Sequence, residues 1–307
     1  MVQYTIKRIG TGILSLLVLV SITFFLTRAI PGSPFESANV SGDILEMMEK
    51  EYSLDNPVIV QCGRYLLNVL RGELGYSYQN PSRAVTDVIA EFLPVTLTIG
   101  GLALLLAIVT GVTFGIWMTA SKQKMVRIIL FSGTIFGIGV PNFALSLFVL
   151  LLFGVKLHWF PVVGLDGWEH YILPVCSLAA YPSSVICRMT AHVYREEMNK
   201  EYVVLARAKG LKDSQIVWRH ILRHIWLPLL NYLGSAAAFL LTGSFAVESI
   251  FTIPGLGSQF VRAISNRDYT LIMGLTIFMG IVVILIQLLV DLLSAWIDPR
   301  IRRSYEG

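Results

Sequence analysis

Six long apolar segments dominate the sequence and limit the folds that it can form. A helix needs about 20 apolar residues to cross the hydrocarbon core of a bilayer, and each of these segments is long enough. They lie at about 9–30, 94–120, 128–155, 171–191, 227–251 and 271–297. Because backbone polar groups must pair with one another inside lipid, such long and continuous apolar runs form helices. The sequence therefore predicts an all-α membrane protein with six transmembrane helices.

Composition and charge agree with this fold class. Only 14% of the residues are charged and the mean hydropathy is +0.67, whereas soluble domains carry about 25% charged residues. Most of the 24 Lys and Arg residues lie beside the apolar segments, at 7–8, 122–127, 188–223 and 300–303. The positive-inside rule places these regions, and so both termini, in the cytoplasm. Because the basic residues are spread over four separate sites, we expect no nucleic-acid partner.

The longest segment outside the predicted spans is residues 32–93, between the first and the second. It contains nine acidic and four basic residues, so we expect it on the extracytoplasmic side. Pro57 suits the first turn of a helix. Val58, Cys62, Tyr65 and Val69 then recur at helical spacing and give that helix an apolar face. The segment is predicted to form a small helical insertion, although packing on the membrane domain alone would also explain the face.

Several residues interrupt the apolar spans. Pro141, Pro174 and Pro182 predict kinks, which membrane helices tolerate where they pack together or line a cavity. Glu248 and Asp291 are acids within the last two spans, and such acids usually face the interior of the bundle. Both are candidate functional residues within the membrane. Glu248 could equally lie near water at the outer end of its helix, and a structural role is favoured for Asp291 because it is close to the cytoplasmic end.

Motifs for catalysis, cofactors or metals are missing from the sequence. It has no phosphate-binding G-x-x-x-x-G-K-[ST], no H-E-x-x-H and no C-x-x-C. His220 and His224 have the spacing of two metal ligands on a helix, but Arg219 and Arg223 on the same face disfavour a cation. The three cysteines are expected to be apolar fillers. We therefore expect a non-catalytic chain that binds no metal and no cofactor.

A charged stretch at residues 201–226, here called the elbow, separates the fourth and fifth apolar segments. Residues 201–208 are good helix formers, and Gly210 suits the left-handed position that ends a helix. Asp213 and Ser214 are expected N-caps of a second helix. In that helix Val217, Ile221 and Ile225 share one face, and the two Arg and two His residues share another. The pattern predicts helix, turn and amphipathic helix projecting into the cytoplasm, although an interfacial helix without a partner is the simpler alternative.

The stretch "LARAKGLKDSQIVWRHILRHIWLPLL" resembles the cytoplasmic loop of ABC-importer permeases, in the form typical of the oligopeptide, dipeptide and nickel branch. Ala206 and Gly210 match the second alanine and the glycine of E-A-A-x-x-x-G. Ile225, Leu227 and Pro228 match the closing I-x-L-P. Val204 replaces the glutamate of the family. The resemblance implies a loop at 195–226 that couples to an ATPase, with contacts expected from Val204, Ala206, Arg207, Ala208, Lys209, Gly210, Leu211, Lys212 and Asp213. Ala206 is expected to fit a cleft on that ATPase.

Further patches extend the resemblance along almost the whole chain. "PGSPF", "LDNPVIVQ", "GELGYSY", "PVTLTIG", "GSFAVESIFTIPGLG", "NRDYTL" and "DPRIR" all look like the B-type membrane subunit of an oligopeptide importer. Residues 1–307 would then form one ABC-importer transmembrane domain in the bacterial plasma membrane. The resemblance implies three kinds of partner: a second permease, two cytoplasmic ATPase subunits that use ATP and Mg, and an extracytoplasmic peptide-binding protein. The pathway would lie between the two permeases, lined by the third, fourth and fifth spans.

Other functions fit parts of the sequence. The same scaffold imports dipeptides and nickel or metallophore complexes in other members of the branch. Because no cluster of His or Cys lies on the expected path, peptides are favoured. A stand-alone secondary transporter would be expected to show an internal repeat and ion-coupling residues at the midplane, and neither is evident. A membrane-embedded enzyme is disfavoured by the missing motifs.

Overall fold

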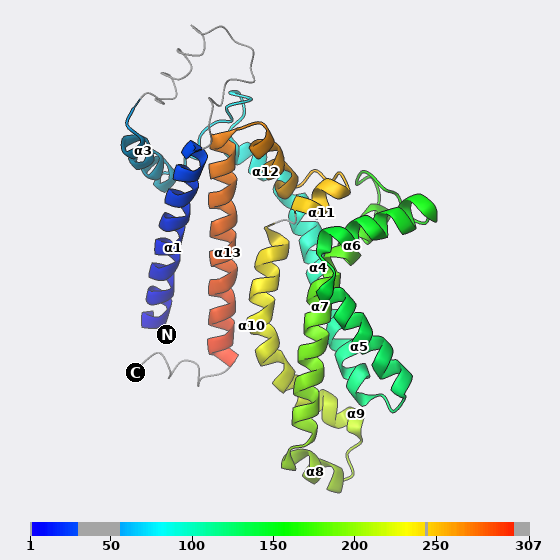
Figure 1. The fold of residues 1–307 in the computed structure, drawn as a ribbon. Coiled ribbons are helices and arrows are strands. Elements are labelled where there is room, and N and C mark those ends of the chain that lie inside the picture. The colour runs from blue at the N-terminus through cyan, green and yellow to red at the C-terminus, as the bar shows by residue number, and fades with distance from the viewer. Residues whose placement is uncertain (1, 30–55, 243–244, 298–307) are drawn as a thin grey trace.

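The computed structural model describes residues 2–29, 56–242 and 245–297, and these residues are mostly helical (Figure 1). Within these ranges there is no β-strand, only an isolated bridge between Tyr76 and Ala84. The helices are α1 (Val2–Ala29), α3 (Val58–Leu70), α4 (Val85–Ala120), α5 (Lys124–Gly139), α6 (Asn142–Val149), α7 (Glu169–Met198), α8 (Glu201–Ala208), α9 (Asp213–Ile216), α10 (Leu222–Leu241), α11 (Phe245–Ile250), α12 (Leu256–Ser265) and α13 (Tyr269–Ile297). Two π-helical segments, Leu150–Lys156 and Val217–Ile221, continue α6 and α9.

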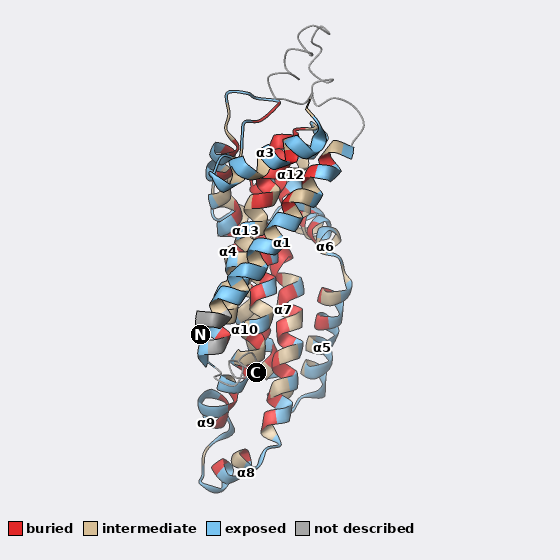
Figure 2. Ribbon diagram, turned by 90° about the vertical axis from the view of Figure 1, so that its left-hand side faces the viewer, coloured by how far each residue is buried: buried red, intermediate tan, exposed pale blue. Residues whose placement is uncertain are grey.

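The long helices lie side by side and form an elongated bundle. Helix α1 packs on α13, α13 on α10, and α10 on both α4 and α7, while α5 covers the outer side of α7. Helices α3 and α12 lie at one end of the bundle, and α8 and α9 project from the other, as both views show (Figures 1 and 2). The elbow predicted from the sequence is therefore a projection at one end of the molecule.

Five of the predicted spans are helices long and apolar enough to cross a membrane. They correspond to α1, α4, α7, the helical region that contains α10, and α13. The third predicted span, 128–155, is interrupted at Pro141, as the sequence predicted. Its two halves, Lys124–Gly139 and Asn142–Lys156, meet at an angle of 111°. The described residues thus contain five spans, or six if this bent pair is one span.

The bend in the third span follows from Pro141. A proline disfavours helical geometry in the residue before it and cannot donate a backbone hydrogen bond. Val140 is accordingly extended, with φ −92° and ψ 124°, and α6 begins directly after Pro141. Pro174 and Pro182, by contrast, lie inside the uninterrupted helix α7. The same residue type thus breaks one span and is accommodated within another.

The predicted insertion at 32–93 is described in part. Its residues 32–55 lie outside the described part of the chain. Pro57 precedes helix α3, as expected, and Cys62 and Tyr65 of that helix pack against Phe24 of α1 and Met273 of α13. Residues 85–93 of the predicted insertion form the first turns of α4.

The most extensive helix contact in the described residues joins α4 to α7. The α4 side of this contact has a small residue at every fourth position: Ala103, Ala107, Gly111 and Gly115, all buried. A Cβ atom on Gly111 would lie 2.7 Å from the Ile186 side chain and 2.8 Å from the Ser183 carbonyl oxygen. Small residues at this spacing let two helix backbones approach closely, which is how helices associate in lipid without a hydrophobic driving force.

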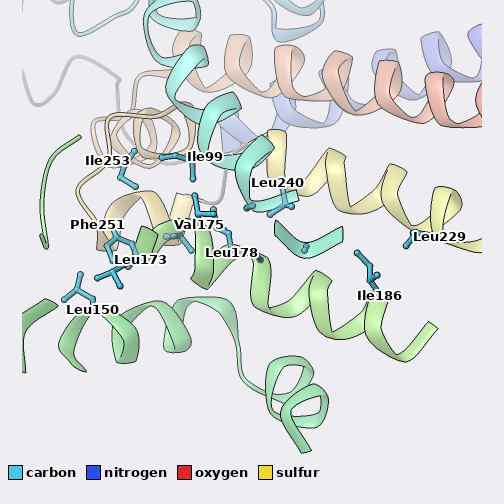
Figure 3. Packing of buried hydrophobic residues seen from close by; sticks show 14 residues of the cluster. Ile99, Leu150, Leu173, Val175, Leu178, Ile186, Leu229, Leu240, Phe251 and Ile253 are labelled. Carbon is cyan, nitrogen blue, oxygen red and sulfur yellow. The ribbon is translucent and has the colours of Figure 1, made fainter. Parts of the chain in front are cut away.

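A cluster of buried side chains extends this contact to neighbouring elements (Figure 3). It joins Ile99 of α4 and Ile186 of α7 to Leu229 of α10, and includes Phe251 and Ile253 of the loop after α11. The cluster therefore fixes the loop between α11 and α12 against the same helix pair.

We predict that Gly111→Ala destabilises the protein, because the added methyl group would overlap with atoms of α7. Overpacking of this kind costs about 1–3 kcal/mol. Gly101→Ala is the matched control, since Gly101 lies on the same helix with nothing within 4 Å of its Cβ position. Thermal unfolding of the detergent-solubilised protein should show a lower Tm for Gly111→Ala only. Equal Tm values for the two variants would contradict the assigned contact.

Candidate functional site

The turn of the elbow has the geometry predicted for Gly210. This residue has φ +84°, in the left-handed region that favours glycine. The Gly210 N–H donates to the carbonyl oxygen of Arg207 at 2.9 Å, and the Leu211 N–H donates to that of Ala206 at 3.2 Å. These two bonds are the Schellman arrangement, which satisfies the last carbonyl groups of a helix. The prediction that Gly210 ends the first helix of the elbow is confirmed.

The elbow has two arms: α8 before the turn at Gly210, and the helical segment from Asp213 onward after it. The start of the second arm differs from the prediction. Asp213 and Ser214 were expected as N-caps, but this is wrong: Asp213 is the first residue of α9, and Lys212 is the N-cap. The Lys212 N–H donates to Oε1 of Gln215 at 3.0 Å. Asp213 instead pairs with Arg207 of α8, with 3.0 Å between Oδ1 and Nε. The Asp213 carboxylate therefore joins the two sides of the turn, and the Gln215 side chain accepts the N–H of the N-cap residue.

The two arms of the elbow enclose an apolar core of their own. Val217, Ile221 and Ile225 share a buried face, as predicted. They pack with Tyr194 of α7 and with three residues of the two short helices: Val203, Ala206 and Ile216. Ala206 is only 7% exposed and so lies inside the elbow. The outward surface of α8 is formed by Val204, Leu205, Arg207 and Ala208, with Lys209 after them.

A buried carboxylate joins the elbow to α7. The side chain of Glu197, at the end of α7, accepts hydrogen bonds from Lys200 Nζ at 2.5 Å and from the Tyr202 hydroxyl at 2.7 Å. His224 Nε2 of α10 lies 3.9 Å from the same carboxylate. The bond to Glu197 raises the pKa of Lys200, and burial together with Glu197 raises the pKa of the Tyr202 hydroxyl.

Sequence reasoning did not select Glu197. The available signal was an acid three residues before a lysine, which is common on exposed helices. Only the return of α10 beside the end of α7 shows that this acid is buried.

A groove of about 670 Å³ opens where the third span bends. Its walls come from the junction of α5 and α6, and from α7, α10 and α11. Most of the lining is apolar, and the polar side chains are Asn142, Tyr181, Tyr232 and Ser235. No charged residue lines it within the described part of the chain. The groove can therefore accept hydrogen-bonding or apolar groups without selecting a charge.

Glu248 lies away from this groove, in a buried polar network. It is 3% exposed on α11. Its Oε1 accepts a hydrogen bond from Thr96 Oγ1 of α4 at 3.1 Å, and its Oε2 accepts one from the Ser258 N–H of α12 at 2.9 Å. Thr96 Oγ1 in turn accepts the Leu256 N–H at 2.9 Å. Glu248 thus ties the loop between α11 and α12 to α4.

Asp291 forms an ion pair with Arg8, with 3.1 Å between Oδ2 and Nε. This pair joins α13 to α1 at the end of the bundle from which the elbow projects (Figure 1). The two sequence-predicted acids are therefore not brought together. Within the described residues no group of three or more His, Cys, Asp or Glu side chains is placed to hold a metal ion.

Comparison with known proteins identifies the family. The profile of the "Binding-protein-dependent transport system inner membrane component" family matches residues 111–303, and the profile of the N-terminal region of such membrane components matches residues 1–100. The chain belongs to this family of binding-protein-dependent permeases. As a permease of this family it is a multi-pass inner-membrane component.

Two curated relatives of this permease align along their whole length. The dipeptide transport system permease protein of Lactococcus lactis is 36% identical over 98% of this chain and 100% of its own. The oligopeptide transport system permease protein of Haemophilus influenzae is also 36% identical, with the same coverage. Among solved structures, the MetNI methionine ABC transporter in an inward-facing conformation has a TM-score of 0.55 at 16% identity. It covers 69% of this chain and 96% of its own, and shows that the permease shares this fold.

We predict a graded loss of stability on substitution of Glu248. Glu248→Gln removes one of two acceptors, and Glu248→Leu removes both and leaves the buried Ser258 N–H without a partner. An unpaired buried donor costs about 1–3 kcal/mol, so Glu248→Leu should have the lower Tm of the two. Glu169→Leu, at an exposed acid on α7, is the control. A Tm unchanged in Glu248→Leu would show that the network does not hold the α11–α12 loop.

Proposed function

We propose that this chain is the non-catalytic membrane subunit of an ATP-driven importer and forms half of the pathway for peptides. The observation that carries the proposal is the full-length likeness to peptide permeases, at 36% identity to relatives from two bacteria. The extracytoplasmic peptide-binding protein, the second permease and the two ATPase subunits with their ATP and Mg are partners that this function requires. The chain itself supplies one wall of the pathway and a docking surface for an ATPase subunit.

The groove at the bend of the third span is the best candidate for one wall of the pathway. It lies between spans that the sequence predicted for this role, and the second permease would cover its open side. The uncharged lining with Asn142, Tyr181, Tyr232 and Ser235 suits a substrate recognised by its backbone amides, because these side chains both donate and accept hydrogen bonds. This chemistry favours a peptide over a nickel complex, whose usual ligands in proteins are imidazole and other soft or nitrogen donors.

The two relatives are named for peptides of different length. The dipeptide and oligopeptide permeases are equally similar to this chain. Because the groove of about 670 Å³ has an uncharged lining, it supports the class of substrate, and selection by length is proposed to rest with the separate binding protein.

The elbow is the proposed docking surface for an ATPase subunit. It projects beyond the bundle at the end that the positive-inside rule assigns to the cytoplasm (Figure 2). Its exposed surface is formed by Val204, Leu205, Arg207, Ala208 and Lys209. Ala206 instead packs in the apolar core between the two arms of the elbow. The described part of the insertion, residues 56–93, lies at the opposite end and would then face the binding protein.

Two helices connect the elbow to the groove. Helix α7 carries Glu197 and Tyr194 at the elbow and Tyr181 at the groove, and α10 carries Ile225 at the elbow and Tyr232 at the groove. A displacement of the elbow by the ATPase therefore acts on the groove walls through rigid helices. Because coupling is reciprocal, the substrate state of the groove would also change nucleotide binding at the ATPase.

We predict that Gly210→Val abolishes coupling while the membrane domain stays folded. A Cβ at this position meets nothing within 4 Å, so the effect arises only from the backbone, where φ is +84°. A β-branched residue there costs about 1 kcal/mol or more. Peptide uptake and peptide-stimulated ATP hydrolysis of the reconstituted complex should fall together. Gly210→Asn is the control, because Asn adopts this conformation more readily and should retain much of both activities. Wild-type uptake and stimulation in Gly210→Val would refute the elbow as the coupling element.

We further predict that a cysteine at Ser235 makes uptake sensitive to a polar thiol reagent. Ser235 lines the groove and is exposed, so the attached group would obstruct the pathway. The experiment uses a Cys176→Ser background, since Cys176 is the exposed native thiol among the described residues. Labelled Ser235→Cys should lose most of its uptake, with protection by excess peptide, whereas Thr113→Cys on the exposed side of α4 should not. Full uptake after complete labelling at residue 235 would exclude this groove from the pathway.

A further inference from the structure

A second groove, of about 570 Å³, lies between the two arms of the elbow. We call it the elbow groove. One wall is formed by α8 and the turn after it, and the other by the segment 217–224. Its lining residues are Tyr202, Leu205, Ala206, Lys209, Leu211, Arg219, His220, Arg223 and His224. The lining thus combines three permanent cations and two histidines with no carboxylate.

The charge of the elbow groove is not neutralised by the described part of the chain. Lys209, Arg219 and Arg223 form no ion pair there. Glu197 lies 3.9 Å from His224 of the lining, and its carboxylate already accepts hydrogen bonds from Lys200 and Tyr202. Asp213 is paired with Arg207. Like charges gathered around a concave surface raise the local potential and attract an anionic group.

We propose that the elbow groove binds an acidic segment of the ATPase subunit, with carboxylates placed against Arg219 and Arg223. This inference rests on the proposed function, because it names the chemistry by which the elbow recognises that partner. Arginine is well suited to the role, since its planar guanidinium group can hold a carboxylate through two parallel hydrogen bonds. Leu205, 56% exposed at the rim, supplies an apolar contact beside the charges.

The position of the groove favours a protein over a lipid. Both views show α8 and α9 beyond the corresponding ends of α1 and α13 (Figures 1 and 2). Lys209 lies at the far end of α8, next to the turn at Gly210. A phospholipid headgroup would have to leave the plane of the membrane to reach this cation. A segment of a cytoplasmic subunit docked on the elbow reaches it directly.

Electrostatic recognition of this kind has a specific signature. Pairs at the rim of an interface mainly set the association rate and the salt dependence of binding. Salt screens such pairs, with a Debye length near 10 Å at about 0.1 M. The permease and the ATPase should therefore separate more readily as salt rises, and this sensitivity should depend on the two arginines.

The test measures binding of the purified ATPase subunit to the assembled permease pair in nanodiscs, at salt concentrations from about 50 to about 500 mM. The variant is Arg219→Gln with Arg223→Gln, and Arg219→Lys with Arg223→Lys keeps the charge. The neutral variant should bind about tenfold more weakly at low salt and show a flatter salt dependence. The lysine variant should retain most of the affinity. Lys122→Gln with Lys124→Gln, at exposed cations outside the elbow, is the matched control.

Three outcomes would overturn the inference. The first is affinity and salt dependence of the neutral variant within about twofold of the wild type. The second is a loss of affinity seen only in nanodiscs with anionic lipid, which would assign the groove to a lipid phosphate. The third is an equal loss in the control at 122 and 124.

Val204→Asp separates this inference from the proposed function: if it leaves ATPase binding intact, the elbow is not the docking surface at all. If Val204→Asp prevents binding and the arginine variant does not, only the groove assignment fails.

Discussion

Close packing of α4 against α7 sets the positions of the surrounding helices. Hydrophobic burial gives little preference for one helix pair over another inside lipid, so shape complementarity and polar contacts have to decide the arrangement. One line of α4 carries only small side chains, so that α7 can approach closely: Ala103, Ala107, Gly111 and Gly115. Thr110 adds a polar contact to the same pair, with 2.8 Å between its hydroxyl and that of Ser183. Helix α10 and the loop after α11 then pack on this pair.

Buried acids act as ties between segments that are distant in the sequence. Glu248 joins α11, α12 and α4, and Asp268 accepts hydrogen bonds from the Tyr78 N–H and the Leu271 N–H, each at 3.1 Å. The two ties hold α12 at both of its ends. A buried carboxylate is costly unless its acceptors are used, and here the donors are hydroxyls of Thr96 and Ser77 and backbone N–H groups, two of which lie in the first turns of α12 and α13. These acids therefore contribute to the order of one end of the bundle, and neither of them lines the uncharged groove.

The elbow keeps its shape through its own apolar core and its own polar bonds. Tyr194 and Glu197 of α7 contact it on one side, and α10 grows out of it on the other. Its cationic surface is thereby held at a fixed distance from the groove between the spans. A rigid projection of this kind can pass a displacement to the helices, whereas a flexible loop would absorb it.

Some features of this protein were determined by the sequence alone. The apolar runs predicted the membrane class and six spans, five of which are single long helices, because helix length and hydropathy are local properties. Gly210 and Pro141 predicted a turn and an interruption, since both act on their own backbone dihedrals. The family followed from many short patches in order. Only the tertiary structure decided the 111° bend of the third span, the burial of Ala206 and the ion pair between Asp213 and Arg207. It also decided the roles of Glu197 and Glu248, because the partners of a side chain are set by segments that the fold brings beside it.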